Sequence, residues 1–499
     1  MKRVFSIFLC FMMLIPFVGC GDKNAPSEDS SEAVETTAEP DWDSLDYNRL
    51  SMLDRLQIDY ESVPDDLPDT DMGGAEIVIH DCMHDLNSIG KHLIGSDQQT
   101  GDIVEDALFA RRLEIEERFN CILKSHSVDH SDYNKYVQMM NSIFLSGDVV
   151  FDLMRIWNTT ASGFAQKGFL SDLSQISTID FNKPWFYSEA TARLSYKNHK
   201  FVSVDLLNGY DVYSSLSCVF FNKDMASRYQ LGDFYSIVRD GQWTFEYMSA
   251  TAKSVYSDLN GNSAVDAEED EFGYECPTAN NSYTLIPALG LYMIGKDEND
   301  IPYLQPSKNI TRFETIFTAI RSFITENDSV VYSKSGGAVF PYGRALFYTH
   351  NLGRMAAMRD VGFDIGILPS YKFDESSDGY KSCFLPYPSA IPSVCEDKER
   401  AGIILSALAA GGYKKIAVPY FETVVKTKYT TDEDSVEMID IIASNATTDG
   451  VIMFTDAMIY TFMQFVEANE GFTSFWASQE KPAQSYLDRI VSTFDGMLG

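Results

Sequence analysis

Oxygen-bearing side chains recur at short intervals in the acidic stretch between residues 258 and 269. They occupy positions 1, 3, 5, 9 and 12 of a twelve-residue loop: Asp258, Asn260, Asn262, Asp266 and Glu269. This is the spacing of an EF-hand-type loop, in which Ca²⁺ takes six or more oxygen ligands. Two positions depart from it, since Ser263 stands where glycine makes the sharp turn and Asn262 replaces a carboxylate. The spacing predicts a structural calcium site, and a solvated acidic loop is the alternative.

A second group of metal-type side chains follows the first predicted strand. In the run His80-Asp81-Cys82-Met83-His84 the potential ligands alternate along the chain. The run lacks a zinc-binding spacing, and alternate positions of a loop need not converge on one ion. We therefore interpret these residues as polar groups at the carboxyl end of a strand, with Asp81 facing a cleft.

The first twenty residues combine a basic start with a short apolar run. Lys2 and Arg3 precede apolar residues over 4–18, and Gly19-Cys20 follows. This pattern is typical of a signal peptide, because the run is short for a membrane span and a small residue marks the cut. Residues 17–20 resemble a bacterial lipobox, which implies lipidation of Cys20 with two acyl chains. An ordinary cleaved signal with an incidental cysteine is the alternative.

A predicted acidic, lipid-anchored tether over residues 20–74 follows the signal peptide at 1–19. Positions 21–74 hold sixteen Asp and Glu residues against three Lys and Arg. The first half has too few apolar groups for us to expect it to be ordered. Apolar residues return over 47–60 and predict a short helix against the body. The formal charge of the 499-residue chain is −34, which argues against nucleic-acid binding and against attraction to anionic lipid. We expect the body to work at the extracellular face of the cell membrane.

The body alternates predicted strands and helices. Strands are expected at 76–80, 121–126 and 148–156, with helices between them. A β-α-β-α-β order implies a parallel sheet with right-handed crossovers, and ligands of such sheets lie beyond the carboxyl ends of the strands. A second α/β unit follows from about residue 200, and helices dominate after Pro392. The pattern predicts two α/β lobes and a cleft.

Several short motifs match one protein family in order along the chain. Phe220-Phe-Asn-Lys-Asp-Met225 and Gly241-Gln-Trp-Thr-Phe-Glu246 resemble the signature of bacterial extracellular solute-binding proteins of family 1, the sugar-type lipoproteins of ABC importers. Weaker matches keep the same order: Gly101–Ala107, Gly168–Leu173, Gly343–Phe347 and Asp364–Pro369. The resemblance covers about residues 75–450. It implies an α/β, type II periplasmic-binding-protein fold, with two α/β lobes and crossover strands around a ligand cleft and a helical C-terminal part.

The resemblance also implies how the chain divides between the lobes. Strands over 216–221 and 384–388 are the expected crossovers. The expected segments are lobe 1 over 75–214, lobe 2 over 215–385, a helical return to lobe 1 over 386–455, and C-terminal helices packing on lobe 2 over 456–499.

Aromatic and polar side chains gather at the expected lobe junctions. Sugars present apolar C–H faces, which stack on aromatic rings, and hydroxyl rims, which bind amide and carboxylate groups. We expect Trp157 to form one wall of a stacking platform, with Asn158, Asp211 and Asn351 as hydroxyl partners. The candidate ligand-binding residues are Asp81, Trp157, Asn158, Tyr210, Asp211, Tyr213, Tyr348, His350, Asn351 and Tyr387.

Three functions fit these features. The resemblance implies a monomeric lipoprotein that captures a small solute, a sugar or oligosaccharide, and delivers it to ABC permease subunits. A lipoprotein that senses a ligand for a membrane receptor would share fold and cleft. An extracellular glycan-active enzyme is the third, but no carboxylate pair stands out as acid and base. We therefore predict no enzyme activity, no catalytic residue and no catalytic cofactor.

Six cysteines remain in the body once Cys10 and Cys20 are set aside. They show no CxxC pair and no regular spacing, and six cysteines allow fifteen pairings. Buried free thiols that pack as small apolar groups are the favoured interpretation. Cys383 and Cys395 are the one pair close enough in sequence to suggest a bridge.

Overall fold

The computed structural model describes one compact unit within Asp46–Gly499. The described residues are 46–47, 50–58, 62–82, 93–126, 133–276, 283–332, 339–428, 430 and 432–499. The predicted signal peptide, Cys20, Met83 and His84 lie outside them.

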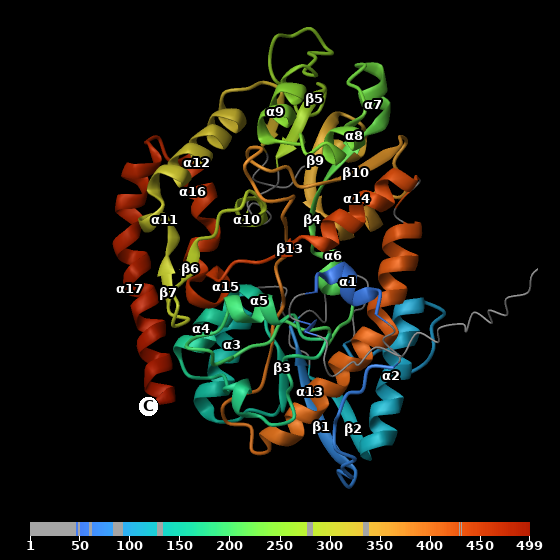
Figure 1. The fold of residues 1–499 in the computed structure, drawn as a ribbon, viewed down its shortest axis with the longest axis vertical. Coiled ribbons are helices and arrows are strands. Elements are labelled where there is room, and N and C mark those ends of the chain that lie inside the picture. The colour runs from blue at the N-terminus through green and yellow to red at the C-terminus, as the bar shows by residue number, and fades with distance from the viewer. Residues whose placement is uncertain are drawn as a thin grey trace, which may run out of the picture. The chain divides into compact units, whose positions relative to one another are not determined.

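The first sheet has four strands in the order β12-β3-β1-β2 (Figure 1). The parallel strands are β1 (Ala75–Asp81), β2 (Cys121–His126) and β3 (Leu153–Arg155), and β12 (Ser389–Ala390) runs antiparallel to β3. Helices α2 (Ile103–Phe119) and α3 (Tyr133–Ser146) connect the parallel strands, as the alternating pattern predicted. Asp102 begins α2 because its carboxylate accepts from the Val104 and Glu105 amides. We call the elements around this sheet lobe 1.

The second sheet has five strands in the order β10-β4-β9-β5-β8. Strand β4 (Ser217–Asn222) is buried at every residue and is antiparallel to β9 (Ala345–Asn351) and β10 (Ile365–Pro369). Strand β5 (Phe272–Cys276) runs parallel to β9 and β8 (Val330–Tyr332). The sheet and its helices form lobe 2. These helices are α7 (Lys223–Arg228), α8 (Phe234–Arg239), α9 (Phe245–Lys253), α12 (Ile310–Thr325) and α14 (Glu433–Ser444).

Three connections carry the chain between the two sheets. The first is α6 (Asp211–Ser214), which leads into β4; the second runs from β10 through β11 (Ser382–Cys383) to β12; the third runs from α14 through β13 (Ala446–Thr447) to α15 (Val451–Phe454). Strands β11 and β13 pair in parallel, so two of the connections are hydrogen-bonded to each other. The remaining elements are α1 (Met52–Leu56), α4 (Ala161–Gln166), α5 (Ser188–Arg193), α10 (Leu285–Ala288), α11 (Gln305–Lys308), α13 (Lys398–Gly412), α16 (Thr461–Glu467), α17 (Phe472–Leu498), β6 (Ile294–Lys296) and β7 (Pro302–Leu304).

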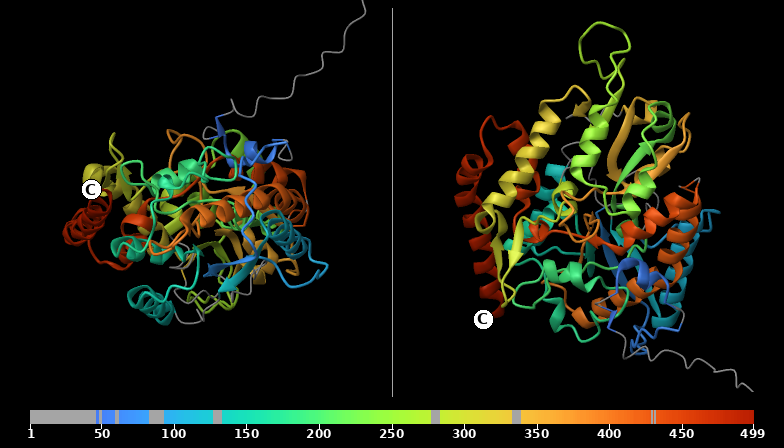
Figure 2. Two further views of the ribbon diagram at one scale, coloured as in Figure 1. Left: turned by 90° about the horizontal axis from the view of Figure 1, so that it is seen from below. Right: turned by 45° about the horizontal axis from the view of Figure 1, so that its top comes forward.

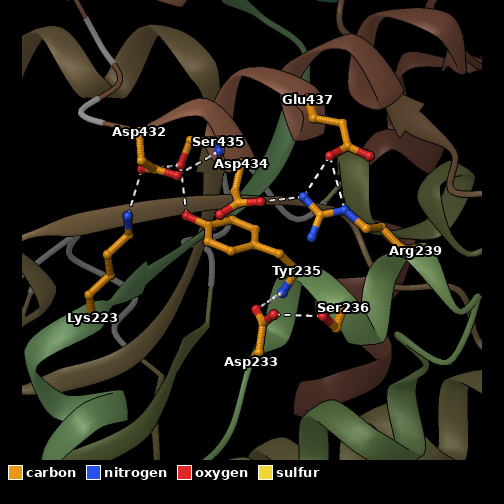
Figure 3. Close-up of polar contacts among 9 residues, drawn as sticks. All are labelled: Lys223, Asp233, Tyr235, Ser236, Arg239, Asp432, Asp434, Ser435 and Glu437. Atoms are coloured by element: carbon orange, nitrogen blue, oxygen red, sulfur yellow. Dashed lines mark hydrogen bonds and ion pairs between the residues drawn. The ribbon is translucent and has the colours of Figure 1, made fainter.

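Helix α14 packs on β10 of lobe 2, whereas the whole segment 386–455 was expected to return to lobe 1. Figure 3 displays the polar contacts that hold it. Arg239 of α8 pairs with Asp434 and Glu437, and the Tyr235 hydroxyl lies 2.8 Å from that of Ser435. An amphipathic pattern predicts that a helix has an apolar face, but it does not tell which sheet that face covers.

The C-terminal segment also differs from its expected place. Helix α17 contacts α12 of lobe 2 and α4 of lobe 1, so it does not pack on lobe 2 alone (Figure 2, red). The part of the predicted tether around α1 lies on the body, as the apolar residues over 47–60 predicted. There the buried Arg55 donates to the carbonyl groups of Pro184 and Phe186 at 3.0 and 2.7 Å.

Within the described part of the chain, one helix, residues 398–427, has the length and apolarity of a membrane span. It begins as α13, continues in π-helical turns, and has 78% of its most apolar window buried inside the protein. It packs so closely on the first connection that a Cβ at Gly209 would lie 2.7 Å from the Ile416 Cβ. We therefore assign this helix to the core of the body.

All six cysteines of the body are free thiols, and all but Cys395 are buried. Cys383 and Cys395 are not bonded to each other in this structure, and the five buried thiols pack as small apolar groups.

Candidate functional site

A buried arginine joins two carboxylates where β1 and β3 end. Arg155 and Asp81 are direct partners in the parallel register of these strands. The Arg155 Nη1 lies 3.6 Å from Asp81 Oδ1, and Nη2 donates to Asp211 Oδ2 at 2.8 Å. Arg155 is 3% exposed and Asp81 is 1% exposed. Because Asp211 begins α6, the ion pairs tie two strands of lobe 1 to the first connection with lobe 2.

The charges of this group depend on one another. Burial alone lowers the pKa of Arg155, but the carboxylates of Asp211 and Asp81 outweigh burial and the pKa is raised. Burial raises the pKa of Asp211, and the positive charge of Arg155 opposes that rise. An unpaired buried charge costs several kcal/mol, so the guanidinium and its carboxylates are stable here only together.

Two half-buried aromatic rings lie beside the ion pairs. The Trp157 and Tyr387 rings meet edge to face, with centroids 6.0 Å apart and planes at 88°. The guanidinium carbon of Arg155 lies 5.3 Å from the centroid of the Tyr387 ring. Burial raises the pKa of Tyr387 to about 12, and the buried Asn158 side chain hydrogen-bonds to it. A neutral phenol, an amide and a partly exposed indole thus lie side by side, able to hydrogen-bond and to stack.

Most of the candidate residues gather around Arg155. The members of this group, which we call the Arg155 group, are Asp81, Trp157, Asn158, Tyr210, Asp211 and Tyr387. Tyr213 does not belong to it, although it lies only three residues after Tyr210. Its ring is fully buried against Phe421, and its hydroxyl accepts from Tyr187 at 2.7 Å. Tyr213 is therefore a core residue.

The other candidates lie in lobe 2, on β9. The register places Asn351 opposite Ser217 and His350 opposite Cys218, where the first connection enters β4. Burial, assisted by the positive charge of Arg354, lowers the pKa of His350 to about 4, so its imidazole is neutral at pH 7. Tyr348 stacks on Phe340, at a centroid distance of 5.4 Å. We call these three residues the β9 group: Tyr348, His350 and Asn351. They lie beside the first connection, which Asp211 begins.

Sequence reasoning did not select Arg155, Arg354 or Tyr283. Arg155 stands near the end of a predicted apolar strand, and a lone charge at that position is the signal that identifies it. Arg354 hydrogen-bonds to Tyr348, and its buried Nε has no partner among the described residues. Tyr283 lies within electrostatic range of Tyr387. No local pattern marks these last two.

The described residues of the run that begins at His80, from His80 to Cys82, are buried in lobe 1. The His80 ring is fully buried, with Nδ1 3.2 Å from His126 Nδ1 and Nε2 3.1 Å from the Tyr136 hydroxyl. Burial also raises the pKa of the Cys82 thiol well above its ordinary value. Over the described ranges, no group of three His, Cys, Asp or Glu side chains could hold a metal ion.

The predicted calcium loop joins α9 to β5 in lobe 2 (Figure 2). The Asp258 carboxylate accepts from the backbone amides of Gly261 and Ser263 at 2.7 and 2.8 Å, and the Asn260 amide donates to Glu269 at 2.5 Å. The remaining candidate ligands also accept from backbone amides of the loop: Asn262 and Asp266. These oxygens accept hydrogen bonds within turns of the loop, and the described carboxylates of the loop form no group of three that could hold a cation. Calcium binding stays a prediction.

No protein-family model and no curated protein sequence matches this chain. Solved structures do match. An ABC substrate-binding protein from Listeria monocytogenes, in complex with cycloalternan, has a TM-score of 0.54 and 15% identity, over 85% of this chain and 99% of its own. The GacH receptor of Streptomyces glaucescens, solved unliganded and with acarbose, has a TM-score of 0.53 and 11% identity, over 83% and 99%.

A third similar structure is the maltose/maltodextrin-binding domain MalE from Bdellovibrio bacteriovorus, bound to maltotriose. Its TM-score is 0.52 and its identity 12%, over 84% of this chain and 100% of its own. These likenesses extend over most of the described body. The chain has the fold of ABC substrate-binding proteins, and the predicted α/β fold class is confirmed.

Replacing Arg155 by methionine should destabilise the fold by about 3–5 kcal/mol, because it leaves two buried carboxylates without their cation. Thermal unfolding measures the loss, which should shrink as the pH falls and the carboxyl groups become protonated. Arg239→Met is the control: Arg239 is 36% exposed in its pairs with Asp434 and Glu437, so its loss should cost far less than that of Arg155. Equal losses in the two variants would contradict the role given to Arg155.

If the loop over 258–269 binds Ca²⁺, a chelator should lower the melting temperature and added Ca²⁺ should restore it, because a ligand of the folded state stabilises by mass action. Asp258→Ala should abolish that response. Asp297→Ala, in the acidic turn between β6 and β7, is the control and should keep it. Identical melting curves of the parent protein with chelator and with excess Ca²⁺ would favour the acidic loop without metal.

Proposed function

We propose that this chain is an extracellular solute-binding lipoprotein that captures a sugar or oligosaccharide and delivers it to an ABC importer. The Arg155 group is the observation that carries the proposal. It puts a half-exposed indole and a phenol beside amide and carboxylate side chains, at the carboxyl ends of two parallel strands in a two-lobed fold. Ligands of such sheets bind at that edge.

The chemistry of the Arg155 group suits a polyhydroxylated ligand. A sugar ring would lie with its C–H face on Trp157, while Asn158 and the carboxylate of Asp211 bind its hydroxyl groups. Arg155 would act through Asp211, holding the carboxylate charged and oriented. In this proposal the β9 group is the contribution of lobe 2, and closure of the lobes would add Asn351 to the hydroxyl partners.

The similar structures support the proposal at the level of fold. Their structures are of binding proteins in complex with cycloalternan, acarbose and maltotriose, which are saccharides. Identities of 11–15% do not carry a ligand from one protein to another. The proposal of a sugar for this chain therefore rests on the side chains around Arg155.

Lipid anchoring is the second part of the proposal and rests on the sequence around Cys20. The body bears on this anchoring, because the chain is attached to lobe 1 from α1 onward. There the Tyr413 hydroxyl donates to the backbone carbonyl of Arg55 at 2.5 Å.

Trp157→Ala should weaken saccharide binding by about two decades, because a stacking ring contributes a few kcal/mol. The melting temperature should change little, since Trp157 is only half-buried. A thermal-shift screen against mono- and oligosaccharides, amino acids and short peptides identifies the ligand, and calorimetry then measures its affinity for the variant. Tyr342→Ala, which removes a 75% exposed ring of lobe 2, is the control and should bind as the parent does. Full affinity in Trp157→Ala would contradict the stacking role.

Cys20→Ser should leave the protein without an acyl anchor, so that it remains uncut or is released to the medium. Membrane fractionation with an antibody to the body measures this. Cys395→Ser, which changes another accessible thiol, is the control and should stay membrane-bound. Wild-type membrane association of a cleaved Cys20→Ser protein would overturn the lipoprotein assignment.

A further inference from the structure

Helix α17 is attached to both lobes, each through a different half. Its buried side chains fall into two groups: Phe472, Phe475 and Trp476 in the first half, and Ala483, Leu487, Ile490 and Phe494 in the second. No side chain between residues 477 and 482 is buried. The helix thus crosses from one lobe to the other over six residues that the core does not hold.

The first half of α17 is bound to lobe 2. The Phe472 ring packs on Phe317 of α12, with centroids 4.7 Å apart. The Trp476 indole Nε1 donates at 3.1 Å to the hydroxyl of Ser307, which lies in α11, just before α12. A packed ring and a directional hydrogen bond fix both the position and the rotation of this half.

The second half is bound to lobe 1. The Phe494 ring stacks on Phe201, with centroids 4.3 Å apart and planes at 4°. The Asp495 carboxylate accepts from the Tyr196 hydroxyl at 2.8 Å, and the Tyr486 hydroxyl lies 3.2 Å from that of Ser162 in α4. These attachments are as specific as those of the first half, so neither end of α17 can slide freely.

Pro482 lies in the helix just before the second group of buried residues. Proline has no backbone N–H, so the Ser478 carbonyl, four residues earlier, lacks its helical donor. Both residues are exposed, and water can solvate that carbonyl when the helix bends. A helix bends most readily at such a position. The weak point of α17 therefore coincides with the stretch between its two attachments.

We propose that α17 is a strap across the two lobes with a joint at Pro482. A rigid helix fixed at both ends would resist rotation of one lobe against the other. The joint lets the lobes rotate while the strap limits how far they separate. This device goes beyond ligand capture, and it holds whatever the protein binds.

Pro482→Ala tests the joint, because alanine supplies the missing N–H and should close the helix. In the purified full-length protein, hydrogen exchange at residues 480–484 should slow about tenfold or more. Spin labels at Leu145→Cys of lobe 1 and Tyr342→Cys of lobe 2, which are 77% and 75% exposed, report the distance between lobes in a Cys395→Ser background. The distance distribution should become narrower than in the parent.

Lys481→Ala is the matched control, since it changes an exposed neighbour and keeps the proline; both readouts should stay as in the parent. Tyr486→Phe combined with Asp495→Ala removes two hydrogen bonds of the lobe 1 end, weakens that attachment and should broaden the distribution. An unchanged distribution in Pro482→Ala despite slowed exchange would overturn the proposal. Unchanged exchange in that variant would overturn it too, because the joint would then not depend on the proline.

Discussion

The buried charge of Arg155 is the constraint on which the candidate site depends. A guanidinium that is 3% exposed must be paired, and its two carboxylates come from different parts of the chain. Asp81 is held by the register of the parallel strands, and Asp211 by the start of α6. The same charge therefore fixes the edge of the lobe 1 sheet, the path of the first connection and the ring of Tyr387 above it. Trp157 and Asn158, which belong to the Arg155 group, come two and three residues after Arg155 in the sequence.

The connections between the lobes share a second constraint. The backbone N–H and C=O groups of each connection need hydrogen-bond partners at the boundary between the two sheets. Strands β11 and β13 do so by pairing with each other, and Ser217 at the start of β4 accepts from the Cys383 amide at 2.9 Å. The first and second connections are therefore joined by a hydrogen bond beside both candidate groups. The Arg155 group lies at this boundary on the lobe 1 side, and the β9 group lies at it on the lobe 2 side. A ligand that contacts both groups couples its binding to the angle between lobes.

The family motifs predicted the fold because they build it. Trp243 of one motif is fully buried, and its indole donates to the carbonyl of Pro369, the last residue of another motif, at 2.9 Å. Asn222 caps α7, and the Lys223 amide donates to the Asp364 carbonyl, so a third motif meets the motif that contains Pro369. Residues with such structural duties specify lobes and crossovers without contacting a ligand. That is why the sequence could predict the fold class and could not name a solute.

The site was predictable only where it follows a strand end. Trp157 and Asn158 come directly after β3, and the rule for parallel sheets selected them. Tyr213 was chosen by the same nearness to a crossover, yet the helix over 398–427 covers its ring, and no local pattern reveals that contact. The places of α14 and α17 were missed for the same reason, since a helix pattern does not name its partner.

Hydrogen exchange of the full chain, with and without a bound oligosaccharide, tests the central claim most directly. Maltotriose and longer malto-oligosaccharides are the first probes, followed by other neutral saccharides. A saccharide that raises the melting temperature should slow exchange at residues 153–158 and 208–213 of lobe 1 and at 346–351 of lobe 2 in the same complex. Protection confined to other surfaces, with these three stretches unchanged, would contradict a sugar site between the Arg155 group and the β9 group.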